Sequence, residues 1–103
     1  MRSRIFCCIL DVVSSAYELD ASEIIGKSHA EEVVNARILV VHHLSRFGFS
    51  DTDIASRLHR TPQAVRHLKS LYACRSESTR DKLFAIISQT TSKRLENIDF
   101  TSE

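Results

Sequence analysis

Glycine and proline are so scarce in this chain that they limit the folds open to it. Its 103 residues include 2 Gly and 1 Pro. A β-sandwich or β-barrel of this length needs many tight turns, which depend on Gly, Pro and Asn. We therefore expect an all-α bundle of about five or six helices. The length and the hydrophobic fraction of 43% suit a single helical domain over residues 1–103, without a linker or internal repeat.

The cysteines favour a cytoplasmic protein. Cys7, Cys8 and Cys74 fit neither a disulfide framework nor a C-x-x-C metal or redox motif. Buried, reduced thiols are therefore expected.

The basic residues before the apolar run of residues 5–10 also resemble the start of a secretory signal peptide. Asp11 interrupts that run, which favours an amphipathic core helix instead, and no apolar run approaches the roughly 20 residues of a membrane span.

Apolar periodicity and capping residues place the expected helices. A short helical turn ends at Gly26, which we expect in the left-handed conformation. A capping box beginning at Ser28 opens the longest helix, and Gly48 stops it. The β-branched residues of this stretch would also suit a strand, but its length and caps favour a helix. The expected helices cover residues 5–17, 21–25, 28–46, 50–58 and 62–73, with a last helix that starts at Ser76 or Ser78.

The last helix is the least regular in sequence. Its periodicity predicts that Leu83, Ile86 and Ile87 point inward. Beyond Ser88 the run Gln-Thr-Thr-Ser weakens the pattern. We therefore expect a frayed C-terminal tail over about residues 89–103.

Residues of about 50–73 meet the physical requirements of a helix-turn-helix. Two short amphipathic helices are joined by a turn at His59 and Arg60, and Ala55 is small where the helices would cross. Thr61 and Pro62 are an N-cap hydroxyl and a proline at the first helical position, where its missing N–H costs nothing. The expected fold class is therefore a small helix-turn-helix bundle.

The second of these helices carries a polar stripe that could meet a DNA major groove. If Val65 and Leu68 face inward, the residues at i, i+3, i+4 and i+7 share an outer face. Glutamine can pair bidentately with adenine and arginine with guanine. The candidates for base readout are Gln63, Arg66, His67 and Ser70, and those for phosphate contact are Arg60, Thr61 and Lys69.

The charge of the chain is unevenly distributed, although its net value is only +1. Residues 52–75 contain five basic residues and one acidic residue, whereas residues 11–32 contain six acidic residues and one basic residue. The basic pole falls on the candidate recognition helix, as expected of a nucleic-acid-binding face. We therefore predict binding to double-stranded DNA; the alternative is an ordinary solvated helix face.

Further features extend over most of the chain, from about Ile9 to Ile87. They are Val12-Val13, Tyr17-Glu18-Leu19, Ile24-Ile25-Gly26-Lys27-Ser28, Val33 to Arg37, Ile54-Ala55 and Val65. In this order they resemble the C-terminal DNA-binding domain of the bacterial replication initiator DnaA.

The resemblance to the DnaA domain implies a Trp-repressor-like fold and a role in regulating replication or transcription. In that family a basic loop before the long helix reaches the minor groove, and the helix-turn-helix reads the major groove. Lys27 and Arg37 match basic positions of this region, which implies that they contact the DNA backbone. Neither recognition of the replication origin box nor nucleotide binding is carried over, and the chain has no Gly-rich phosphate loop.

No catalytic site, cofactor or metal is expected. His42 and His43 are adjacent, so they point about 100° apart on a helix, and neither has a second ligand at i+4. Cys7 and Cys8 lie in an apolar stretch, which disfavours a reactive thiolate.

A helical protein-interaction domain that kept the fold but lost DNA binding is the alternative function. Two features favour it: the family's arginine-rich loop is replaced here by Ser28, His29, Glu31 and Asn35, and DNA would repel the acidic first third of the chain. Phe47 and Phe49 would belong either to the core or to an interaction edge. Because one recognition helix reads a single half-site, a homodimer or a larger protein partner also remains open.

Overall fold

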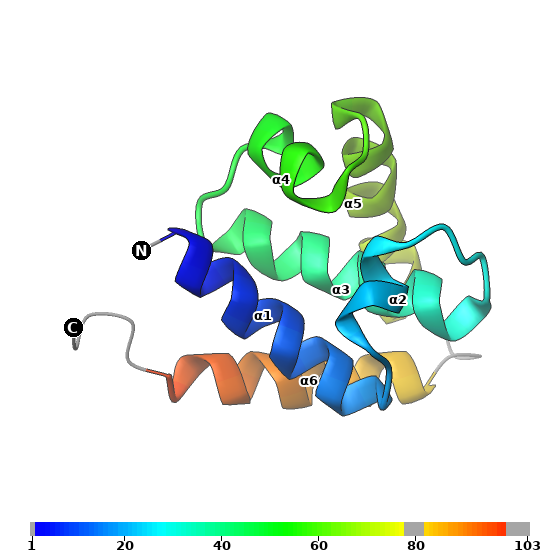
Figure 1. Ribbon diagram of the computed structural model, residues 1–103. Helices are drawn as coiled ribbons and strands as arrows, with labels where there is room; N and C mark the ends of the chain where they lie inside the picture. The colour runs from blue at the N-terminus through cyan, green and yellow to red at the C-terminus, as the bar shows by residue number, and fades with distance from the viewer. Residues whose placement is uncertain (1, 78–81, 99–103) are drawn as a thin grey trace.

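The computed structural model describes residues 2–77 and 82–98, and this part of the chain forms six α-helices and no strand. The predicted all-α class is therefore confirmed. None of the described helices is long and apolar enough to cross a membrane. The helices are α1 (Arg2–Tyr17), α2 (Ala21–Ile25), α3 (Glu31–Arg46), α4 (Asp51–Leu58), α5 (Pro62–Glu77) and α6 (Lys82–Glu96), as Figure 1 shows.

The centre of the bundle is α3, against which all five other helices pack. Ten of its 16 residues are buried, including the β-branched pair Val40 and Val41. A helix with so many buried positions must be covered by neighbours on several sides. Two groups of helices provide this cover: α1 and α6 below α3 in the view of Figure 1, and α4 with α5 above it.

The helix ends follow their local sequence in some places and depart from it in others. The Ser50 hydroxyl caps α4 by accepting from the Asp53 N–H (3.1 Å), and Gly48 ends α3 with a positive φ of 92°. The expected cap at Ser28 is wrong, because its hydroxyl accepts from the Ala30 N–H (3.2 Å) and α3 begins only after Ala30. Gly26 is extended, with φ −69° and ψ −163°, so the left-handed prediction is also wrong.

The inward face of α6 differs from the predicted one. Leu83 and Ile86 are 57% and 60% exposed, whereas Phe84 and Ile87 are buried. The buried face continues through Thr91 and Leu95, spaced so that one side of the helix meets α1 and α3. The prediction that the tail frays after Ser88 is therefore wrong for residues 89–96, which are helical. Ser76 lies within α5, and Ser78 and residues 99–103 lie outside the described residues.

Polar groups inside the bundle explain why the polar run of α6 remains helical. The Thr91 hydroxyl donates to the Ile87 carbonyl (2.9 Å) and meets Nε2 of the buried His43 (2.9 Å). The ring of His42, the residue before His43, stacks on the ring of Tyr72 with centroids 3.5 Å apart. Burial, together with the smaller effects of the neighbouring His42 and Arg46, lowers the pKa of His43 to about 4. His43 therefore stays neutral near pH 7 and can share a hydrogen bond with Thr91 inside the core.

The phenylalanines and the cysteines divide between core and surface. Phe49 is 5% exposed and belongs to the core, whereas Phe47 is 39% exposed. The cysteines were expected to be buried, but Cys7 and Cys74 are exposed.

The corrected face of α6 gives a stability prediction. Phe84→Ala should lower the free energy of unfolding by about 3–5 kcal/mol, because it removes a fully buried ring. Ile86→Ala is the matched control on the same helix and should change it by less than about 0.5 kcal/mol. Urea denaturation followed by circular dichroism measures both, and a large effect at Ile86 would contradict the observed face.

The buried His43 predicts a loss of stability in acid. Its pKa is about 4 in the folded state, below the ordinary value of about 6.5. The unfolded chain therefore binds a proton more readily at this residue, which should lower stability by on the order of 3 kcal/mol between about pH 6.5 and pH 4. The adjacent His42, whose pKa burial and Arg46 also lower to about 4, adds to the loss. His43→Gln should flatten this part of the profile, and the exposed His29→Gln should not. Equal profiles for the three proteins would contradict the assignment.

Candidate nucleic-acid interface

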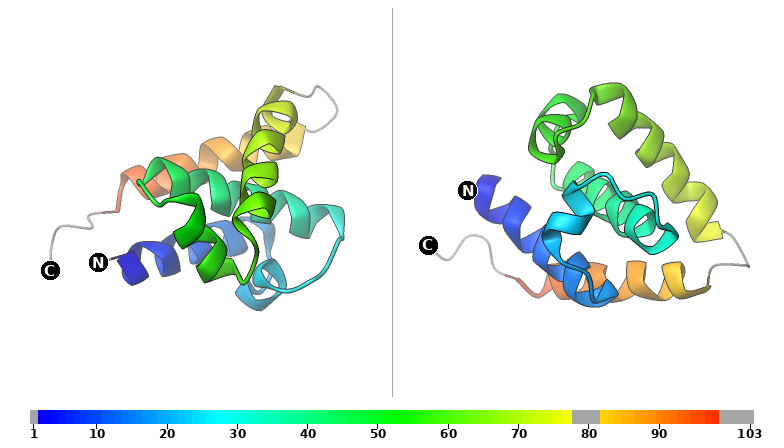
Figure 2. Two further views of the ribbon diagram at one scale, coloured as in Figure 1. Left: turned by 90° about the horizontal axis from the view of Figure 1, so that it is seen from above. Right: turned by 45° about the vertical axis from the view of Figure 1, so that its right-hand side comes forward.

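The helices α4 and α5 are joined by a three-residue turn, His59 to Thr61, and form a corner at the top of the bundle (Figure 2). His59 takes the left-handed conformation with φ 56°, which ends α4 abruptly. The Arg60 N–H then donates to the Ala55 carbonyl (2.8 Å), and Thr61 caps α5 by accepting from the Ala64 N–H (3.1 Å). Local sequence predicted this turn and cap, although α5 continues to Glu77 instead of ending near Ala73.

The predicted stripe for base readout is exposed along α5. Of this helix only Val65 and Leu68 are buried, as expected, and both face the core. The Ser70 hydroxyl donates to the His67 carbonyl (2.6 Å), so its proton is used within the helix while its lone pairs remain able to accept. The exposed members of the stripe are Gln63, Arg66, His67 and Ser70.

Asp51 partly neutralises this surface. Its carboxylate accepts from Lys69 Nζ (3.0 Å) and lies 3.9 Å from Nη1 of Arg66. Asp51 lies just outside the basic segment of residues 52–75. The charge count of that segment therefore overstates the positive charge of the folded surface. Both cations are solvent-exposed, where such ion pairs contribute only about 0–1 kcal/mol and can be exchanged for other partners.

Two of the predicted phosphate contacts, Arg37 and Arg60, are structural. Arg37 is 4% exposed and donates to the carbonyls of Ile24 (2.8 Å) and Gly26 (3.0 Å). Arg60 donates to Gly26 (2.6 Å) and Ile25 (2.9 Å). Burial lowers the pKa of both arginines, and the charge of Arg60 lowers that of Arg37 further. Their guanidinium groups hold loop carbonyls, so both residues serve the fold and not a DNA contact.

The remaining candidates for phosphate contact lie at the surface. Lys69 and Thr61 are exposed on α5 and at its cap, and Lys27 is exposed in the loop after α2. Because Arg60 binds the carbonyls just before Lys27, this loop is held beside the α4–α5 turn. The structure thus brings Lys27 toward the candidate interface through a contact that the spacing of residues did not reveal.

Two basic residues that were not among the predicted contacts lie beside this surface, Arg2 in α1 and Arg57 in α4. Arg2 and Arg57 both pair with Asp53, at 2.8 and 3.0 Å. The Arg57 guanidinium also lies over the rings of Phe6 (5.6 Å) and Phe49 (5.3 Å). The i, i+4 spacing of Asp53 and Arg57 is visible in the sequence, whereas the approach of Arg2 depends on the tertiary fold. These cations extend the charged surface from α4 to α1.

The described residues contain no group of three or more His, Cys, Asp or Glu side chains that could hold a metal ion. A pocket of about 230 Å³ lies between the end of α3 and α6, and its lining includes His43, Phe47 and Glu96. Its rim carries no pair of carboxylates.

Comparison with known proteins gives no relative: no protein-family model, curated protein or solved structure matches the chain. The resemblance to the DnaA domain therefore stays a prediction, and the candidate function depends on the geometry of α4 and α5.

The structural role of the two arginines can be tested by stability. Arg37→Ala should lower the free energy of unfolding by about 1.5–3 kcal/mol, because it removes the donor of the buried Ile24 carbonyl and leaves the Gly26 carbonyl with Arg60 alone. Arg60→Ala should act in the same direction. Lys27→Ala removes the same charge from an exposed position and should change stability by less than about 0.5 kcal/mol. Urea denaturation measures the stability of each variant, and an Arg37→Ala variant as stable as the wild type would contradict the assignment.

Proposed function

We propose that this protein binds double-stranded DNA and places α5 in the major groove. The observation that carries the proposal is the position of the readout stripe: its four residues are exposed on α5, while the core holds this helix by Val65 and Leu68. A helix that presents one continuous polar face at the corner of a helix-turn-helix is the element that commonly reads base edges. Gln63 and Arg66 are the residues best suited to bidentate base contacts.

Phosphate contacts would come from three positions around this helix. Lys69 and Lys27 provide charge, and Thr61 lies at the N-terminus of α5, where backbone N–H groups favour an anion. Asp51 competes for Lys69 and Arg66, so DNA binding requires exchange of internal ion pairs for pairs with phosphate. This predicts a moderate affinity.

The resemblance to the DnaA C-terminal domain supports the same proposal. It adds a Trp-repressor-like arrangement and a role in the control of replication or transcription. We further propose a cytoplasmic protein that acts by binding, without catalysis, cofactor or nucleotide.

A protein-interaction domain is the second candidate function. The observation that favours it is the exposure of Leu83 and Ile86, which lie on α6 and not on the proposed DNA-binding face. The ion pairs of Asp51 and Asp53 also reduce the charge available to DNA.

The direct test is selection from random duplexes at low and moderate salt, followed by anisotropy titrations on the enriched sequence. Enrichment of a defined half-site would support the proposal. Absence of salt-dependent binding to any duplex at low ionic strength would overturn it and favour the second candidate.

Variants of α5 separate base contacts from phosphate contacts. Arg66→Ala should weaken specific binding by roughly 1–3 kcal/mol and relax the sequence preference, because it removes a base contact. Lys69→Ala should weaken all duplexes alike and reduce the salt slope by about 1. Identical effects of the two variants on selected and random duplexes would contradict the assigned roles.

Removing Asp51 should have the opposite effect. Asp51→Asn frees Lys69 and Arg66 from their ion pairs, so duplexes should bind more tightly. Asp11→Asn makes the same change in net charge on an exposed position of α1 and is the matched control. Anisotropy titrations at fixed salt measure both, and equal gains from the two variants would mean that only net charge matters.

A further inference from the structure

An apolar stripe on α6 faces solvent. Leu83 and Ile86 lie three residues apart and are 57% and 60% exposed, and the exposed Thr90 continues the same face one turn further. Phe84 and Ile87 already hold α6 in the core, so the fold of the domain does not need this stripe. Large exposed aliphatic side chains that are clustered, and not scattered, mark an interaction surface.

The stripe continues on one side into a cleft with an acidic rim. This cleft has a volume of about 240 Å³ and lies between the end of α1, the start of α3 and the first turns of α6. Leu83 and Ile87 form its apolar wall, and Glu18 and Glu32 are its charged residues. The cleft can accept an aliphatic side chain of a binding partner, and its two carboxylates can pair with a cation of that partner.

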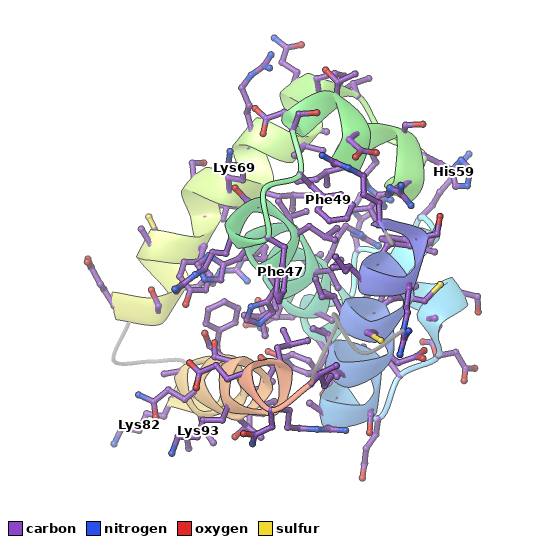
Figure 3. All side chains as sticks on the ribbon, turned by 90° about the vertical axis from the view of Figure 1, so that its left-hand side faces the viewer. Phe47, Phe49, His59, Lys69, Lys82 and Lys93 are labelled. Carbon is purple, nitrogen blue, oxygen red and sulfur yellow. The ribbon has the colours of Figure 1, made fainter. Side chains whose placement is uncertain are left out.

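The other side of the stripe is basic. Lys82 and Lys93 are exposed, and Figure 3 shows that both project from the same side of α6, away from α1. Across the first turns of α6 the surface therefore changes from basic at Lys82, through the apolar stripe, to acidic at Glu18 and Glu32. A partner of one charge sign would match only one of these flanks.

We propose that this face binds a second copy of the same chain. A two-fold axis along α6 exchanges the two flanks, so Lys82 of each copy meets Glu18 and Glu32 of the other. Leu83 and Ile86 of one copy then pack against the same residues of the other copy, and each cleft accepts an aliphatic side chain from the other copy. This self-association is independent of the proposed DNA binding, because α5 carries the readout stripe on another face.

The first test is the dependence of molecular mass on concentration, measured by sedimentation equilibrium without DNA. The wild-type chain should self-associate, and Ile86→Arg should weaken this association about tenfold or more. Ala73→Arg adds the same charge at an exposed position of α5 and should leave it unchanged. Ile86→Ser, without the added charge, should also weaken it. A strictly monomeric wild-type chain, or an Ile86→Arg variant that associates normally, would overturn the proposal.

A charge exchange tests the arrangement of the two flanks. Lys82→Glu and Glu32→Lys should each weaken association, and the double variant should restore most of it. Lys82→Glu combined with Glu31→Lys is the matched control, because Glu31 lies beside Glu32 but outside the cleft, and it should give no rescue. Equal rescue by both combinations, or by neither, would overturn the proposed pairing. Circular dichroism confirms that each variant is folded.

Discussion

The arrangement of the bundle depends on two guanidinium groups that hold the same stretch of backbone. Arg37 from α3 and Arg60 from the α4–α5 turn both donate to the carbonyl of Gly26. The carbonyls at the end of a helix lack intrahelical partners and carry partial negative charge, so they suit two nearby cations without a carboxylate. One short loop thereby fixes α2, α3 and the helix-turn-helix relative to one another.

This use of arginine changes how the charge of the chain should be interpreted. A basic residue beside a helix-turn-helix can serve the fold or a ligand, and the sequence does not distinguish the two. Arg60 belongs to the fold, whereas Arg66 and Lys69 remain at the surface beside Asp51. The basic residues of this segment thus fall into two groups: some hold the fold together, and others lie on a surface that neighbouring carboxylates partly neutralise.

The features that sequence analysis predicted correctly are those determined by neighbouring residues. The cap at Thr61, and the end of the long helix at Gly48, depend on a few adjacent groups. The inward face of α6 was not predictable in the same way. Its polar Thr91 is buried because His43, 48 residues away, supplies a partner. Burial of Arg37 likewise depends on carbonyls brought to it by the tertiary fold.

The position of α6 has a consequence for any assembly that uses it. This helix lies across α3 from α4 and the α4–α5 turn, at the opposite side of the bundle (Figure 1). Repressor-like dimers that read adjacent half-sites need both recognition helices on one side. Two copies joined through α6 would have their α5 helices facing outward in opposite directions. If α5 binds DNA as proposed, such an assembly would bridge two separate duplex segments and hold distant parts of a DNA molecule together.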